Sequence, residues 1–238
     1  MSIVLVVAAH PDDEILGVGG TVRRHIENGD AVYALVLGEG QTSRWTQREL
    51  ADPEVLKKLH EDSYNAAKII GFKDIFFESL PDNRFDSVAL LDVVKIVESY
   101  IEEIKPAIIY THHSGDLNVD HQVTHKAVLT ATRPIGNYSV KEIYGFETVS
   151  STEWNFGNKE QSFYPQKYVD VTDTFDVKCK AMEEYKSELC QFPHPRSLKM
   201  LEAVATMRGS TVGIELAEAF EVIRIISAET NVQGGCSS

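Results

Sequence analysis

Short apolar segments alternate with longer segments of helical periodicity through the first 150 residues. Four runs rich in Val, Ile, Phe and Tyr have the length and composition of buried strands: residues 3–8, 31–37, 75–77 and 107–111. Three helical patterns lie between them: residues 19–27, 54–70 and 88–104. This alternation predicts an α/β fold, a Rossmann-like three-layer sandwich in which a mostly parallel sheet carries helices on both faces.

The second half of the chain shows a looser version of this pattern. The expected elements are a helix at 120–132, strands at 142–147, 168–171 and 222–226, and two or three helices between 174 and 220. A polar and aromatic stretch, residues 150–165, interrupts them. We therefore predict a single domain over residues 1–228 with an elaborated C-terminal part, and a disordered tail at 229–238.

The charge balance argues against a nucleic-acid or membrane-surface partner. The chain has 36 acidic and 23 basic residues, a formal net charge of −13, whereas binding to phosphates requires clustered cations. Its three cysteines include no Cys-x-x-Cys pair, which favours a reducing compartment. The apolar run at residues 3–9 has no basic region before it and is too short to span a membrane, so we expect a strand in a cytoplasmic enzyme.

A dense polar motif, Ala-His-Pro-Asp-Asp-Glu at residues 9–14, directly follows the first predicted strand. Ligands of open α/β sheets bind outside the carboxyl ends of the strands, so these side chains lie where a site is expected. Three acids and a histidine within five residues repel one another unless a cation neutralises the acids. A bound divalent metal ion explains the motif better than an exposed acidic turn does.

A second polar cluster, residues 112–121, follows the fourth predicted strand. Loops at the carboxyl ends of parallel strands can lie side by side, so His10 and Asp13 can meet His121 on one metal ion. Two imidazoles and one carboxylate, with a fourth position left to water, are typical of catalytic zinc. Ferrous iron suits these ligands nearly as well. The alternative for His121 is an ordinary place in the first turn of a helix capped by Asp120.

These motifs give the chain a family resemblance. The sequence resembles the PIG-L/LmbE superfamily of zinc-dependent N-acetyl-sugar deacetylases in the motif at 9–14, in Gly-Val-Gly-Gly-Thr at 17–21 and in the pair Asp120-His121. The resemblance covers the first 130 residues well and the remainder loosely.

What the resemblance implies is a metal-dependent hydrolase that removes an N-acetyl group from an amino sugar, an N-acetylglucosamine-type glycoside, phosphate or nucleotide sugar. It implies that His10, Asp13 and His121 bind Zn²⁺, that Asp12 is the general base and that Asp120 orients a ligand. Family members often form trimers or hexamers, so the resemblance also implies a homo-oligomer.

The chain departs from the family pattern at position 118. Many members have a histidine three residues before the metal-binding histidine, but this chain has Asn118. An asparagine donates a hydrogen bond to an oxyanion but cannot deliver a proton. We therefore expect Asn118 to act with a further imidazole. The candidates are His113 and His194 first, then His112 and His125; His194 lies in a loop held rigid by two prolines.

Loops after the second and third strands open onto the same edge of the predicted sheet. Arg44 and Arg84 are the cations best placed to hold a phosphate or to donate to sugar hydroxyls, and Asp82 can accept from hydroxyls. Arg196 shares the proline-rich loop of His194. We assign these four residues to substrate binding; the alternative is a surface loop with solvated charges.

Three other functions compete with deacetylation. The same superfamily includes a zinc-dependent hydratase of an unsaturated dicarboxylic acid, and Asn118 makes such divergence conceivable. A dinucleotide-binding domain is disfavoured because its third glycine is misplaced and acidic side chains would face the pyrophosphate. A metal-binding protein without catalysis is disfavoured by Asp12, because a purely structural site does not use an unliganded carboxylate.

Overall fold

The computed structural model describes residues 1–135, 140–157 and 159–227, and the predicted tail at 229–238 lies outside them. Its centre is a seven-stranded sheet of order β3-β2-β1-β4-β5-β7-β6. The strands are β1 Ile3–Ala8, β2 Ala31–Gly38, β3 Asp74–Leu80, β4 Ile108–His112, β5 Glu142–Phe146, β6 Lys167–Asp170 and β7 Ala217–Ile225. Strands β1 to β5 pair in parallel, while β7 runs antiparallel to both β5 and β6. The predicted α/β architecture with a mostly parallel sheet is confirmed.

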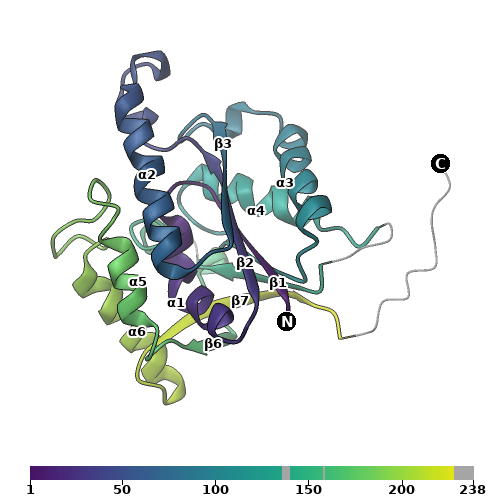
Figure 1. The fold of residues 1–238 in the computed structure, drawn as a ribbon, viewed down its shortest axis with the longest axis vertical. Coiled ribbons are helices and arrows are strands. Elements are labelled where there is room, and N and C mark those ends of the chain that lie inside the picture. Colours follow the sequence, from purple (N-terminus) through teal and green to yellow (C-terminus); the bar gives the residue numbers. More distant parts are fainter. Residues whose placement is uncertain (136–139, 158, 228–238) are drawn as a thin grey trace.

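Helices cover both faces of the sheet (Figure 1). They are α1 Asp13–Glu27, α2 Pro53–Ile70, α3 Leu90–Ile104, α4 Val119–Ala131, α5 Phe175–Met182 and α6 Leu198–Val212. Helices α1, α2, α5 and α6 lie on one side, and α3 and α4 lie on the other. Side chains of β1 alternate between the two cores: Val4 and Val6 pack with the first group of helices, Leu5 and Val7 with the second. Each such buried side chain stabilises the fold by about 1.5–3 kcal/mol.

The order of the strands places two loops together. Strand β1 lies between β2 and β4, and Val4 and Val6 are in register with Ile108 and Tyr110 of β4. The chain turns from β1 toward β2 on one side and later returns to β4 on the other side. The carboxyl ends of β1 and β4 therefore flank the point where the strand order reverses, which is where open α/β sheets bind ligands.

Two elements begin earlier than the sequence pattern predicts. Helix α1 begins at Asp13, six residues before the predicted start at residue 19, and includes three glycines that lower helix propensity. Packing requires one of them, since a Cβ on Gly17 would lie 2.2 Å from the Phe146 ring. Strand β7 begins at Ala217, five residues before the predicted 222, because Glu218 interrupts the apolar pattern yet is buried.

Glu218 connects the C-terminal part of the chain to α1. One carboxylate oxygen lies 2.6 Å from the ammonium group of Lys178, and both oxygens accept hydrogen bonds from backbone N–H groups of α1, at Gly20 (3.0 Å) and Thr21 (2.7 Å). Lys178 also donates to the carbonyl of Leu16 at 2.8 Å. Each charge in this buried pair is therefore compensated, and these contacts connect α5 and β7 to α1.

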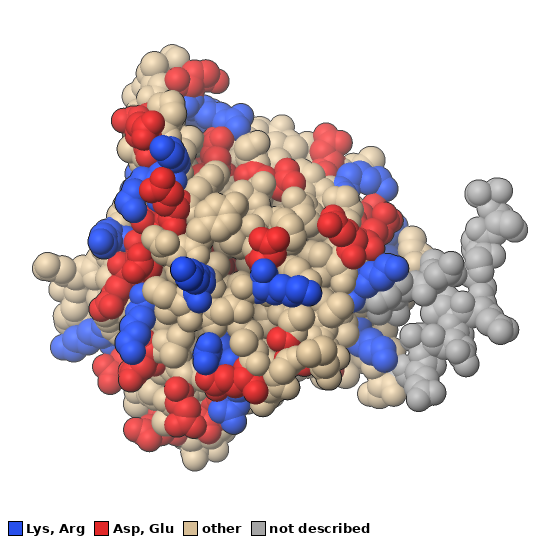
Figure 2. All heavy atoms as spheres, viewed as in Figure 1, with Lys and Arg blue, Asp and Glu red and all other residues tan. Residues whose placement is uncertain are grey.

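The surface carries charges of both signs. On the face drawn in Figure 2, Lys and Arg side chains lie among Asp and Glu side chains. Across the three described segments, the structure has no helix that combines the length and the apolar character needed to cross a membrane.

We predict that Glu218→Gln lowers the free energy of unfolding by about 3 kcal/mol, because it leaves the Lys178 ammonium buried without its counter-charge. Urea unfolding followed by circular dichroism measures this. The matched control is Glu27→Gln, which removes the carboxylate of an exposed pair with Arg23 and should change stability by less than about 0.5 kcal/mol. Equal effects of the two substitutions would contradict the assignment.

Candidate metal centre and substrate pocket

Three different elements present the predicted metal ligands. His10 follows β1, Asp13 is the first residue of α1, and His121 lies in the first turn of α4. The N-cap of α4 is Asn118, whose side-chain oxygen accepts from the backbone N–H of Asp120 at 2.8 Å. The alternative in which Asp120 caps this helix is therefore wrong, and the Asp120 carboxylate makes other contacts.

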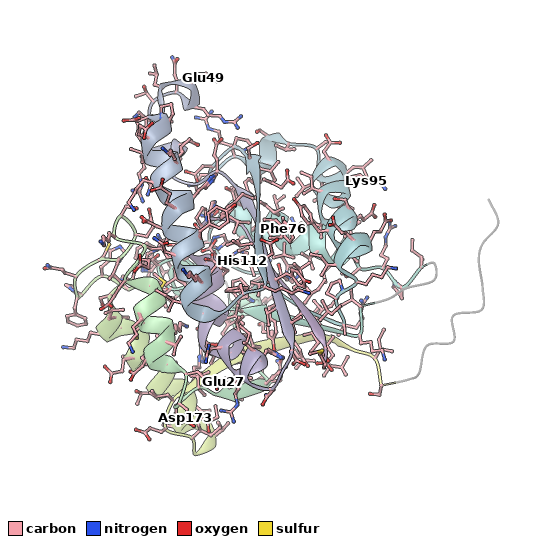
Figure 3. All side chains as sticks on the ribbon, in the orientation of Figure 1. Glu27, Glu49, Phe76, Lys95, His112 and Asp173 are labelled. Atoms are coloured by element: carbon pink, nitrogen blue, oxygen red, sulfur yellow. The ribbon has the colours of Figure 1, made fainter. Side chains whose placement is uncertain are left out.

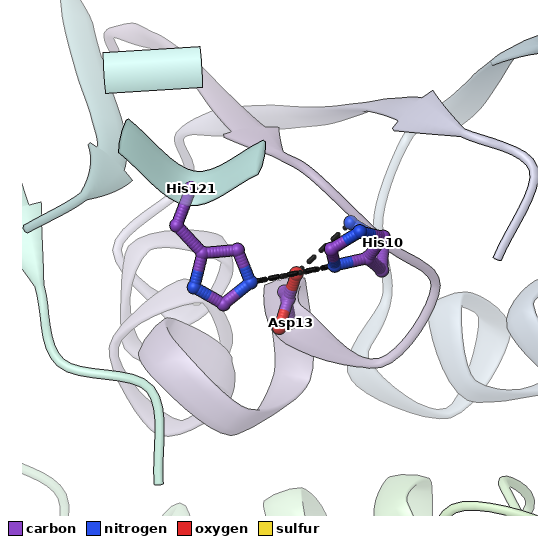
Figure 4. Close-up of side chains that lie close together, drawn as sticks. All are labelled: His10, Asp13 and His121. Carbon is purple, nitrogen blue, oxygen red and sulfur yellow. Dashed lines mark hydrogen bonds and ion pairs between the residues drawn. The ribbon is translucent and has the colours of Figure 1, made fainter. Parts of the chain in front are cut away.

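The nearest donor atoms of His10, Asp13 and His121 form an equilateral triangle (Figure 4). His10 Nδ1, Asp13 Oδ2 and His121 Nε2 are separated by 3.3 Å in each of the three pairs. Ligands about 2.0–2.1 Å from a tetrahedral ion are separated by roughly 3.3–3.4 Å. The second oxygen of Asp13 is buried without a hydrogen-bond partner among the described residues. The three residues therefore fit a divalent metal ion.

Two further carboxylates hold the imidazole rings. Asp120 Oδ2 lies 2.9 Å from His10 Nε2, and Asp116 Oδ1 lies 3.1 Å from His121 Nδ1. These contacts leave His10 Nδ1 and His121 Nε2 facing Asp13, as metal ligation requires. The sequence analysis gave Asp120 an orienting role, and the structure places it against His10 rather than against its neighbour His121. Asp116 was missed, because its spacing from His121 follows no regular periodicity.

The orienting carboxylates are themselves fixed. Asp120 accepts from the backbone N–H groups of Asn83 at 2.6 Å and Phe85 at 2.9 Å. Asp116 accepts from the hydroxyls of Ser151 and Thr152. In each carboxylate, the oxygen that contacts the histidine accepts one of these bonds and the other oxygen accepts the second, so the carboxylate is held in place beside the ring.

The site attracts positive charge. Burial opposes protonation of His121, yet Asp13 and Asp116 raise its pKa to about 9. Burial likewise opposes ionisation of Asp116, yet its contact with His121 lowers the pKa of that carboxyl to about 2. Asp13 and Asp116 create a negative potential that stabilises a proton on His121. The same potential stabilises a divalent cation, so the electrostatics also favour a metal ion here.

Asp12 lies beside the triangle but outside it. Its backbone is in the left-handed region, with φ of 107°, where a side chain is strained by about 1–3 kcal/mol. Its N–H donates to Glu14 Oε2 at 3.1 Å, and Tyr185 donates to the other oxygen of Glu14. Burial raises the pKa of Asp12 well above its usual range, although Arg196, 3.1 Å away, opposes the shift. Asp12 is thus a carboxylate suited to accept a proton.

A pocket of about 430 Å³ opens beside His10 and Asp12. Its walls come from the loops after β1, β2, β3 and β4 and from the segment between α5 and α6. The predicted residues in these walls are His10, Asp12, Arg44, Asp82, Asn118 and Arg196. Arg84, predicted to bind substrate, is exposed and does not line the pocket.

None of the four candidate histidines is among the described residues that line this pocket. His113 contacts Glu221 at 2.6 Å and the carbonyl of Gln161 at 2.8 Å, which occupies both ring nitrogens. His194 accepts from the backbone N–H of Arg196 at 3.1 Å. These two residues were predicted to be catalytic, and among the described residues their side-chain hydrogen bonds are to Glu221, Gln161 and Arg196 rather than to the three residues of the triangle.

The other two candidates are packed in the interior. His112, labelled near the centre of Figure 3, accepts from the N–H of Ala9 at 2.9 Å and stacks on the His121 ring at 3.9 Å between centroids. Burial lowers its pKa well below the usual value, so the ring is neutral. His125 Nδ1 contacts the carbonyl of His112 at 2.8 Å. His112 therefore packs directly against the ligand His121, and His125 contacts His112.

Glu188 is a pocket residue that the sequence analysis missed. It is buried, and it accepts from Gln41 at 2.5 Å, from Arg44 at 2.8 Å and from Arg196 at 2.9 Å. In the sequence it lies in a polar segment, where a glutamate is expected to be solvated. No local pattern indicates that Arg44, which follows β2, contacts Glu188, or that Arg196 in the same segment as Glu188 also contacts it.

The chain has relatives among known proteins. The model of the GlcNAc-PI de-N-acetylase family, PIG-L, matches residues 5–132, more than half of the chain. The uncharacterized deacetylase YaiS of Escherichia coli is 29% identical over 190 residues, which cover 77% of this chain and 90% of the relative. A probable N-acetyl-alpha-D-glucosaminyl L-malate deacetylase 2 of Bacillus subtilis is 31% identical over 195 residues, 78% of this chain and 82% of the relative.

Solved structures share the fold over nearly the whole chain. The N,N'-diacetylchitobiose deacetylase of Pyrococcus horikoshii aligns with a TM-score of 0.74 at 19% identity, covering 93% of this chain and 84% of that one. A 4-carboxy-2-hydroxymuconate hydratase of Pseudomonas putida aligns with a TM-score of 0.73 at 22% identity, covering 97% and 99%. Given the match of the family model and the identity to the Bacillus subtilis relative, the chain belongs to the PIG-L family of de-N-acetylases.

Proposed function

We propose that this protein is a zinc-dependent hydrolase that removes the N-acetyl group from an amino sugar. The observation that carries the proposal is the triangle of His10, Asp13 and His121 with the Asp12 carboxylate beside it, at the edge of a pocket of sugar size. A buried carboxylate that is held next to the ligands, and is not one of them, suits a general base.

The names of several relatives support an amino-sugar substrate. They include a diacetylchitobiose deacetylase of Thermococcus kodakarensis, a probable N-acetyl-alpha-D-glucosaminyl L-malate deacetylase 2 of Bacillus cereus and a 1D-myo-inositol 2-acetamido-2-deoxy-alpha-D-glucopyranoside deacetylase of Kineococcus radiotolerans. A structural neighbour, the teicoplanin deacetylase Orf2, is described in a zinc-inhibited form. Zinc is our proposal for this chain because the donor set is two imidazoles and a carboxylate.

Residues of the pocket have different roles in amide hydrolysis. Zinc, when bound, supplies a more acidic water and a Lewis acid for the acetamide carbonyl. Asp12 takes the proton of the attacking water and returns it to the departing amine, because the other acids of the described wall, Asp82 and Glu188, already accept hydrogen bonds from Ser43 and from the two arginines. Arg196 holds the Asp12 carboxylate through its contact at 3.1 Å. The Asn118 amide lines the pocket and donates a hydrogen bond toward the developing oxyanion.

A hydratase is the second candidate. It is favoured by Asn118 and by the similarity to the 4-oxalmesaconate hydratase of Pseudomonas putida. Addition of water to a carbon–carbon double bond would use the same triangle and the same base. An unsaturated dicarboxylate, however, requires unpaired cations in the pocket, and both arginines that line it already contact Glu188.

The compartment and the assembly stay predictions. Cys179 and Cys190, the described cysteines, form no disulfide, which is compatible with the cytoplasmic location that we propose. Three exposed aromatic side chains, Trp154, Phe156 and Tyr164, lie within residues 150–165. We propose this stretch as a subunit contact in a homo-oligomer; the alternative is a lid or a wall on which a sugar stacks.

We predict that the purified protein contains one metal ion per chain and releases acetate from at least one member of a panel of N-acetylglucosamine derivatives. A chelator should abolish release, and added Zn²⁺ should restore it, because the metal ligands lie at the pocket. Acetate assay and metal analysis measure the two quantities. If an unsaturated dicarboxylate is hydrated while no amide is cleaved, the hydratase function replaces the deacetylase.

Substitutions at two adjacent positions separate binding of the metal from the chemistry. Asp12→Asn should retain the metal and lower kcat by a factor of about 10²–10⁴, because it removes the base and leaves the triangle intact. Asp13→Asn should lose the metal. Metal content of each purified variant, measured beside kcat, checks both outcomes. An active Asp12→Asn enzyme would remove this residue from the mechanism.

We predict that Asp116→Asn weakens metal affinity by about 10–100-fold, because His121 loses the carboxylate that fixes its ring. Competition with a chromogenic chelator measures the affinity. Asp92→Asn, at an exposed position on α3, is the control and should leave affinity unchanged. An unchanged affinity in Asp116→Asn would mean that Asp116 does not orient the ligand.

A further inference from the structure

The pocket contains two arginines and one carboxylate that binds both. Arg44 and Arg196 are the Lys or Arg residues among its described lining residues. The Arg44 guanidinium lies 2.8 Å from each oxygen of Glu188, and Arg196 Nη1 lies 2.9 Å from Glu188 Oε2. Glu188 comes from the segment between α5 and α6, beyond residues 5–132 where the family model matches.

Glu188 neutralises this part of the pocket. Its side chain is 6% exposed, so its charge is little screened by solvent. Arg196 is shared with a second acid, since the same Nη1 lies 3.1 Å from Asp12 Oδ2. Neither guanidinium therefore faces the pocket without a counter-charge.

The formal charge of the pocket wall is negative. Two arginines stand against the three carboxylates of Asp12, Asp82 and Glu188, which gives 2 − 3 = −1. Asp13 and Asp120 offset the two charges of a divalent ion in the triangle. A phosphate or carboxylate on the substrate would therefore enter a pocket of like charge.

The remaining polar groups suit hydroxyls. Gln41, Ser43, Asn83 and Asn118 line the wall with uncharged side chains. Asp82 accepts from the Ser43 hydroxyl at 2.6 Å and from its N–H at 2.9 Å, which fixes the carboxylate at the pocket surface. Amides, hydroxyls and carboxylates recognise the hydroxyl groups of a sugar by donating to them or accepting from them.

On the basis of the deacetylase function proposed above, we infer that Glu188 is a specificity-determining residue that restricts the pocket to uncharged acetamido sugars, such as simple glycosides and oligosaccharides, and excludes sugars that carry a phosphate or carboxylate. Glu188 acts through the two arginines, by cancelling the charge that would otherwise bind an anion.

The test compares two substrates that differ only at the anomeric position: the methyl glycoside of N-acetylglucosamine and N-acetylglucosamine 1-phosphate, each as both anomers. Wild-type kcat/KM should be at least about tenfold higher for the glycoside. In Glu188→Gln the ratio should shift toward the phosphate by about tenfold or more, because two guanidinium groups become available to it. Glu183→Gln removes the same charge from an exposed position on the same segment and should leave the ratio unchanged.

Binding separates a failure of this inference from a failure of the proposed function. Calorimetric titration of wild-type protein needs no turnover and no variant, and the methyl glycoside should bind more tightly than the 1-phosphate. Acetate release with a preference for the phosphate overturns the inference and leaves the deacetylase standing. No release, with tighter binding of the glycoside, overturns the deacetylase and supports the charge selection. Tighter binding of the phosphate, or no binding of either sugar at millimolar concentration, overturns the inference.

Discussion

The parallel pairing of β1 with β4 is the constraint on which the rest of the site depends. The metal triangle combines His10, which follows β1, and Asp13, the first residue of α1, with His121 of α4, more than one hundred residues later. Their donor atoms meet only because the two strands are neighbours in register and end at the same edge of the sheet. The cores on both faces stabilise that pairing, so the geometry of the ligands depends on the burial of the β1 side chains.

Several layers of hydrogen bonds then convert this proximity into a fixed geometry. Backbone N–H groups of the loop after β3 fix Asp120, which fixes His10. Hydroxyls of the loop after β5 fix Asp116, which contacts His121. A neutral ring, His112, fills the space behind. Four loops thus share the placement of three ligands, and the segment between α5 and α6 adds Arg196 and Glu188.

The sequence was informative where chemistry and periodicity coincide. The strand pattern predicted the sheet, and the acidic motif at residues 9–14 predicted His10, Asp12 and Asp13 at a strand end, where the structure has them. It was uninformative where a role arises from tertiary contacts. Asp116 acquires its role from His121, and Glu188 acquires its role from Arg196 in its own segment and from Arg44, which is distant in the sequence. His113 and His194 were predicted to be catalytic because of their residue type. In the structure, the His113 ring contacts Glu221, and the His194 ring accepts from the backbone N–H of Arg196. The first turns of α1 were not predicted, because their glycines have a low helix propensity that packing against Phe146 overrides.

At Asp12, backbone strain opposes the role that we propose for the side chain. A glycine would adopt φ of 107° without steric cost, so the fold by itself favours glycine over aspartate at this position. The chain instead retains a side chain that is strained and buried next to other acids. An Asp12→Gly protein would lose the backbone strain together with the carboxylate that we propose as the base. Selection for thermal stability alone would therefore favour glycine at this position, while the role that we propose for Asp12 favours aspartate at a cost to folding.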